Sequence, residues 1–261
     1  RLTLTGLRSI EDANLNFDVN REGERAALGS DVTNGLASAR LDAILGERAT
    51  STTIVSWYRN REQFNFDGQV RADARRSNTP DSDLAFGLNT ILFDRSFDVR
   101  DVSMRQELGI QVSPRHLLGA GIELHYLETG VGFTIVGDRN QTQANGSSIR
   151  GGAGLPDNLQ SALRGTRGGL WLQDTYTPSP RVSFEPGLRV DWSTINGGTT
   201  LSPRIAASYA VGRGARVRVA GGLYTQSPGY EKLTQSDYFL DLSSPREQGL
   251  RHERATHVVI G

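Results

Sequence analysis

The four histidines are the first candidates for chemistry, because imidazole binds metals and titrates near neutral pH. They are spread along the chain as His116, His125, His252 and His257. No two of them have the short helical or paired spacing that holds zinc. The chain contains no cysteine, so thiolate sites are excluded as well. We therefore expect no metal site and no cofactor.

Three other functional motifs are incomplete or absent in this sequence. Residues 138–143 begin like a calcium-binding loop, but Gln143 stands where that loop needs glycine. The glycine-rich segment 151–154 lacks the strand-to-helix context of a phosphate-binding loop. No Gly-x-Ser-x-Gly motif is present for acyl transfer. These observations predict no catalytic residue and a protein that is not an enzyme.

The charged residues follow a period of two along much of the chain. From Val182 to Trp192 the even positions are apolar or proline, and the odd positions are polar or glycine. This alternation is typical of a β-strand with one apolar and one polar face. It predicts about eleven strands. The segments that show it are 1–8, 13–20, 35–46, 49–60, 102–112, 118–126, 168–177, 182–192, 201–211, 215–223 and, cut short, 255–261.

The expected strands of about 9–14 residues are long for a soluble sheet and suit a tilted crossing of a bilayer. The links between them alternate between short and long. The long links include 61–98, 128–167 and 226–253, and 9–12, 113–116 and 212–214 are among the short ones. An up-and-down membrane barrel has such short turns at one rim and long loops at the other. We therefore predict an all-β fold, an antiparallel up-and-down transmembrane β-barrel.

Composition excludes two other classes of protein. The formal net charge is zero, whereas nucleic-acid-binding domains usually carry a basic excess. No segment reaches the roughly 18–20 consecutive apolar residues of a membrane helix. We expect no nucleic-acid partner and no helical membrane span.

The polar strand faces are expected to line the lumen of the barrel. On the lipid face near the bilayer midplane, each charge would cost roughly 2–4 kcal/mol. Inside, the charges can solvate the lumen and pair with one another, or they can steer a charged ligand, and both roles stay open. The expected lumen-lining residues are Arg105, Glu107, Glu123, Arg189, Asp191, Arg204, Arg216 and Arg218.

Long outer loops are expected to bind the substrate, because loops vary on a rigid scaffold. Aromatic and arginine side chains suit stacking against sugars, aromatic chelators or peptides, and they equally suit packing of one loop on another. The candidate substrate-binding residues are Phe64, Phe66, Arg76, Tyr230, Tyr238 and Phe239.

A series of short motifs follows in order through the last third of the chain. They are Trp-Leu-Gln-Asp-Thr-Tyr at 171–176, Pro-Gly-Leu-Arg-Val-Asp at 186–191, Leu-Ser-Pro-Arg at 201–204, the segment 218–228, and the pattern formed by Leu250, Glu253, Ala255 and His257. In their order and spacing these motifs resemble the barrel of TonB-dependent outer-membrane receptors, among which the Oar-like and carboxypeptidase-regulatory-like groups are candidates.

The resemblance implies a protein of the bacterial cell outer membrane that imports a scarce nutrient. It implies a 22-stranded barrel occluded by a plug domain, so about eleven strands would be part of one such barrel domain, residues 1–261 being a fragment that lacks the plug. The implied partners are outer-membrane lipid, the plug domain of the same full-length chain, the TonB–ExbB–ExbD complex and an unidentified small ligand.

Two alternatives remain open at the level of sequence. The first is a passive porin or structural outer-membrane barrel, which would need no plug. The second is a soluble β-rich carbohydrate-binding protein, whose apolar strand faces would point inward.

Overall fold

A computed structural model describes residues 1–18, 25–71, 88–137, 158–212, 214–226 and 251–261. Its regular elements are ten β-strands in the described part of the chain. They are β1 (Leu2–Asp18), β2 (Arg25–Leu45), β3 (Ala49–Arg71), β4 (Leu88–Ser113), β5 (His116–Gly137), β6 (Asn158–Ser179), β7 (Val182–Ser193), β8 (Thr199–Val211), β9 (Ala215–Gln226) and β10 (Glu253–Ile260). None of the described residues forms a helix with the length and hydropathy needed to cross a membrane.

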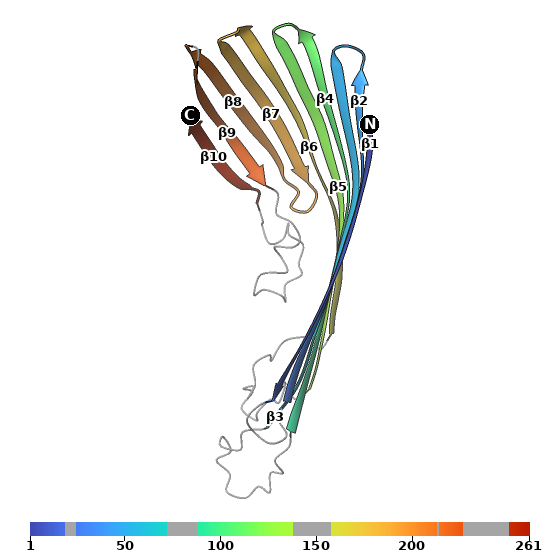
Figure 1. Ribbon diagram of the computed structural model, residues 1–261. Helices are drawn as coiled ribbons and strands as arrows, with labels where there is room; N and C mark the ends of the chain where they lie inside the picture. The colour runs from blue at the N-terminus through green and yellow to red at the C-terminus, as the bar shows by residue number, and fades with distance from the viewer. Residues whose placement is uncertain (19–24, 72–87, 138–157, 213, 227–250) are drawn as a thin grey trace, which may run out of the picture.

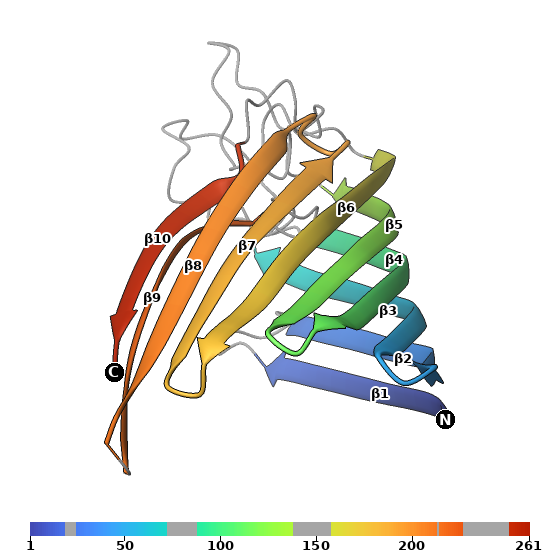
Figure 2. The same cartoon turned by 90° about the horizontal axis from the view of Figure 1, so that it is seen from above.

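The strands form one antiparallel sheet in which each strand pairs with its neighbours in sequence, from β1 to β10 (Figure 1). This order confirms the predicted up-and-down topology. Figure 2 shows that the sheet is curved, with β1 and β10 at its two edges. The short turns that follow β2, β4, β6 and β8 lie together at one end of the sheet (Figure 1). Gly46 and Gly212 take positive φ values of 71° and 72° at two of these turns, a conformation that glycine adopts without steric cost.

The first strand differs from the prediction. Segments 1–8 and 13–20 were expected to be two strands separated by a turn at 9–12, but one continuous strand, β1, runs from Leu2 to Asp18 and includes residues 9–12. It pairs with β2 without interruption from Leu2 opposite Leu41 to Asp18 opposite Arg25. Segment 9–12 contains neither glycine nor proline, and pairing with β2 satisfies its backbone. The described sheet therefore has ten strands instead of about eleven.

Strands β3 to β6 extend well into the segments expected to be loops. At the far ends of β3 and β4 the apolar side of the sheet carries polar residues, as in the pairs Gln63–Ser96 and Asn65–Asp94. Apolar side chains such as Phe64, Phe66 and Phe93 lie there on the opposite face, so hydropathy no longer marks one apolar face, although the backbone ladder continues. The described parts of the expected loops 61–98 and 128–167, which are residues 61–71, 88–98, 128–137 and 158–167, belong to these strands.

The two faces of the sheet differ in chemistry. One face, called the apolar face below, carries cross-strand neighbours such as Val55, Met104 and Leu124, whose side chains are 47%, 43% and 40% exposed. Contiguous apolar surface of this kind is rare on soluble proteins and suits contact with lipid. Apart from glycines, the buried strand residues of the described chain all lie on the opposite or polar face. They are Leu127, Thr129, Phe133, Ser193, Thr200 and Ser202.

Gln106 is a polar residue on the apolar face, and its amide is satisfied locally. It accepts a hydrogen bond from Thr53 Oγ1 on β3, and its Nε2 donates to Ser51 Oγ at 2.8 Å. These bonds lower the cost of placing an amide toward lipid.

Candidate functional site

A chain of ionisable side chains crosses the polar face from β4 to β7. His125 Nδ1 lies 2.9 Å from Asp101 Oδ2, and His125 Nε2 lies 3.0 Å from Glu123 Oε1. Arg189 Nη2 lies 3.4 Å from Glu123 Oε2 and 2.7 Å from Asp191 Oδ1. These five residues are called the polar-face network below.

The network is partly withdrawn from solvent. The side chains of His125, Asp101 and Asp191 are 17–18% exposed, and those of Glu123 and Arg189 are 30% and 34% exposed. Both ring nitrogens of His125 already have carboxylate partners, so neither is left to bind a metal ion. No group of three or more potential metal ligands is found in the described part of the chain.

A glycine allows the network to cross from β5 to β7. Gly169 on β6 lies between Glu123 and Asp191 in the same cross-strand row. A Cβ atom at this glycine would lie 2.6 Å from Asp191 Oδ1 and from Arg189 Nη2. Because the glycine has no side chain, Arg189 can reach over β6 to Glu123.

The structure places all eight expected lumen-lining residues on the polar face. Glu123, Arg189 and Asp191 belong to the network. Arg105 Nε donates to Glu107 Oε1 at 2.8 Å on β4 itself. The others lie on β8 and β9: Arg204, Arg216, which donates to Ser208 Oγ at 3.0 Å, and Arg218.

His125 falls on a polar position of the alternation over 118–126, but its partners were not predicted from the sequence. Asp101 also falls on a polar position of the alternation, yet only the register brings it beside His125, one strand away. Arg167 Nη2 approaches the same carboxylate at 4.0 Å. The available signal was three ionisable residues on the polar face of β4, β5 and β6: Arg167 is the direct cross-strand partner of His125, and Asp101 is its diagonal neighbour.

The polar face also carries an aromatic group at the end farthest from the short turns. The ring centroids of Phe64 and Phe93 are 6.0 Å apart in an edge-on arrangement, and those of Phe93 and Phe133 are 6.5 Å apart. These three residues are called the phenylalanine cluster below. Phe64 and Phe66 were expected in a loop, but both lie in β3. The phenyl ring of Phe66 lies over Gly68, where a Cβ atom would be 2.7 Å from it.

The remaining candidate substrate-binding residues lie outside the described residues. They are Arg76, Tyr230, Tyr238 and Phe239.

Solved structures of the RagAB peptide importer share the fold of this chain. The RagAB peptide importer in its closed-closed state has a TM-score of 0.52 and 12% identity, over 79% of this chain and 24% of that chain. Its open-open state has a TM-score of 0.51 and 12% identity, over 91% and 26%. The siderophore receptor PirA from Pseudomonas aeruginosa has 14% identity over 86% and 42%, with a TM-score of 0.39. The chain thus spans about a quarter of the RagAB chain it matches. No curated protein matches the sequence.

One family model accounts for almost the entire sequence. Residues 2–254 match the family described as TonB dependent receptor-like, beta-barrel. The all-strand antiparallel sheet with its apolar and polar faces agrees with that match. The chain therefore belongs to the TonB-dependent receptor β-barrel family of the bacterial outer membrane.

Proposed function

We propose that the full-length protein actively imports a scarce nutrient across the outer membrane with energy supplied through TonB. Residues 1–261 contribute part of the barrel wall. The observation that carries this proposal is the two-faced curved sheet, whose apolar face suits lipid while its other face holds the polar-face network. Membership of the TonB-dependent receptor β-barrel family also supports active import.

In this proposal the polar face lines the interior of the barrel. The network and the other charged residues of this face keep the wall hydrated and pair with one another. The rest of the polar face contacts the plug domain of the same full-length chain. The TonB–ExbB–ExbD complex displaces this plug domain.

The phenylalanine cluster would form part of the substrate path at the outer end of the wall. Phe133 is 8% exposed and its ring centroid lies 6.5 Å from that of Phe93, while Phe64 and Phe93 present half-buried aromatic surface. Arg95, which pairs with Glu62, lies in the cross-strand row of Phe64 and Phe133. Aromatic surface beside a cation suits a small ligand with both flat and charged parts, such as a peptide or an aromatic chelator.

Uptake by cells tests this proposal. The full-length gene is expressed in a strain that lacks it, and growth is measured with candidate peptides or ferric chelators as the limiting nutrient, with TonB present or deleted. We expect growth that requires both the gene and TonB. Uptake that continues without TonB would indicate a passive porin, and a protein that stays soluble without detergent would indicate the carbohydrate-binding alternative.

A pair of variants separates the substrate path from the barrel scaffold. Phe93→Ala removes the central ring of the phenylalanine cluster and should reduce uptake. Phe184→Ala removes a ring of the apolar face, where Phe184 is 41% exposed, and should leave uptake unchanged. Equal uptake by the two variants would remove the phenylalanine cluster from the path while leaving TonB-dependent import in place.

A further inference from the structure

The apolar face changes from apolar to basic toward the end away from the short turns. On β3, Trp57 is followed on this face by Arg59 and Arg61, and on β4 Val102 is followed by Arg100 in the same direction. The register aligns one cross-strand row of partners on this face. That row is Arg8, Gly35, Arg59, Arg100, Glu128 and Arg164. The five residues Arg8, Arg59, Arg61, Arg100 and Arg164 are called the arginine patch below.

The arginine patch keeps an excess of positive charge. Two carboxylates lie within it: Asp98 is 2.6 Å from Arg59 and 3.7 Å from Arg61, and Glu128 is 2.9 Å from Arg164. Five arginines against two carboxylates leave a net charge of +3 in the arginine patch. An anion is therefore the complementary ligand.

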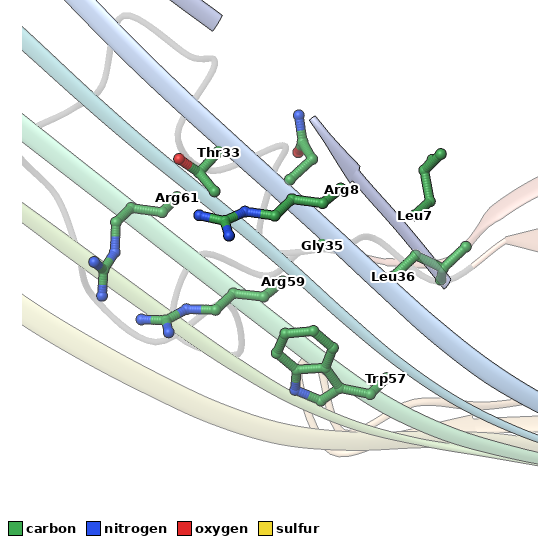
Figure 3. Close-up of a pocket in the computed structure, with 9 residues that line it drawn as sticks. Leu7, Arg8, Thr33, Gly35, Leu36, Trp57, Arg59 and Arg61 are labelled. Carbon is green, nitrogen blue, oxygen red and sulfur yellow. The ribbon is translucent and has the colours of Figure 1, made fainter. Parts of the chain in front are cut away.

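An open groove of about 480 Å³ lies in the arginine patch, between β1 and β3. Arg8, Arg59, Arg61 and Trp57 line it, and Gly35 leaves its floor without a side chain between two of the arginines. Figure 3 shows the side chains of Arg8, Arg59 and Arg61 extending in the same direction, away from Trp57.

Two of these arginines keep donors for a ligand. Arg59 is engaged by Asp98 through both Nε, at 3.0 Å, and Nη2, at 2.6 Å. Arg61 approaches the same carboxylate at 3.7 Å, beyond hydrogen-bond distance, and is 55% exposed. Arg8 has no carboxylate within ion-pairing distance in the described part of the chain.

We infer that this groove binds the phosphate group of an anionic lipid in the outer leaflet. Guanidinium groups bind phosphate through paired, charge-assisted hydrogen bonds. Trp57 lies where an aromatic residue marks the boundary between hydrocarbon and headgroups in membrane barrels. Below Trp57 the apolar face continues through Val55 and Leu4 as a surface for acyl chains. This continuity favours a lipid headgroup over a free phosphate ion.

The inference concerns the outside of the barrel wall and does not depend on import. Its failure would leave the proposed function untouched, because lipid binding and TonB-dependent uptake are measured separately.

Lipid retention tests the inference. The full-length protein is placed in phosphatidylcholine nanodiscs that contain either bisphosphorylated lipid A or the same glycolipid without phosphates, and the bound glycolipid is measured by native mass spectrometry. We expect preferential retention of the phosphorylated form, weakened by added salt. The double variant R8Q/R61Q should bind it about thirtyfold more weakly, as expected when two arginines facing an anionic headgroup are neutralised.

The double variant R216Q/R218Q is the matched control. It removes the same charge from the polar face of β9 and should retain the phosphorylated lipid like the wild type. Because R8Q/R61Q leaves the Arg59–Asp98 pair intact, the sheet should still fold, and the comparison of the two glycolipids needs only the wild-type protein. Equal retention of the two glycolipids by the wild type, or equal retention by wild type and R8Q/R61Q, would overturn the inference.

Discussion

Replacing His125 by phenylalanine tests whether the polar-face network holds the sheet together. The substitution keeps a ring of similar size but removes both bonds, to Asp101 at 2.9 Å and to Glu123 at 3.0 Å. A hydrogen bond to a charged group contributes about 1.5–3 kcal/mol. The lower figure applies because the carboxylates remain 18% and 30% exposed. Two bonds at about 1.5 kcal/mol each predict a loss of about 3 kcal/mol in the free energy of unfolding.

The assay is equilibrium unfolding of the full-length protein by urea in phospholipid vesicles, followed by tryptophan fluorescence and by heat-modifiable migration in gels. His116→Phe is the matched control. His116 makes one bond, to Asp174 at 2.7 Å, its side chain is 42% exposed, and its ring stacks on Tyr176 at 4.4 Å. Phenylalanine can keep that stacking, and an exposed ion pair contributes little. We expect His116→Phe to unfold close to the wild type.

Equal stability of His125→Phe and wild type would refute the structural role of the network. Equal losses of unfolding free energy in the two histidine variants would show that burial on the polar face does not strengthen a histidine–carboxylate pair.

Two further predictions concern the two faces of the sheet. Met104→Arg puts a charge on the apolar face and should lower the stability of the folded barrel by about 2–4 kcal/mol, whereas Ser103→Arg on the polar face of the same strand should change it little, as measured by urea unfolding in vesicles. Gly121→Ala should lower the free energy of unfolding by about 1–3 kcal/mol through overpacking, because its Cβ would lie 2.4 Å from Trp171 Nε1. Gly6→Ala should lower it much less in the same assay, because no atom lies within 4 Å of that Cβ position. Equal effects within either pair would contradict the assignment of faces or the close packing of the indole.

Much of the sheet could be predicted from the sequence because a period of two in hydropathy records which face meets lipid. β7 shows this best, since the even positions from Val182 onward are apolar and the structure gives a strand over Val182–Ser193. The eight charged residues assigned to the opposite face follow from the same alternation.

The remaining parts of the sheet and of the candidate site depend on features that the alternation of hydropathy does not reveal. Beyond the apolar surface the lipid-side positions of the strands become polar, and apolar residues such as Phe64 and Phe93 lie on the opposite face, so the ends of β3 to β6 and the middle of β1 were assigned to loops. The Glu123–Arg189 pair depends on register across β6 and on the missing side chain of Gly169. Arg59 and Arg61 were absent from the candidates because charges were sought on the polar face alone.

Cysteine accessibility along β4 tests the central claim, that one face of this wall meets lipid and the other meets water. The 261 residues contain no cysteine, so an introduced thiol is the only one in this segment, and its labelling is read against the full-length protein without the substitution. Single substitutions Val102→Cys, Ser103→Cys, Met104→Cys and Arg105→Cys are made in the full-length protein, and isolated outer membranes are treated with a charged, membrane-impermeant thiol reagent. We predict labelling at 103 and 105 and protection at 102 and 104. Uniform labelling at all four positions, or the opposite alternation, would contradict the account.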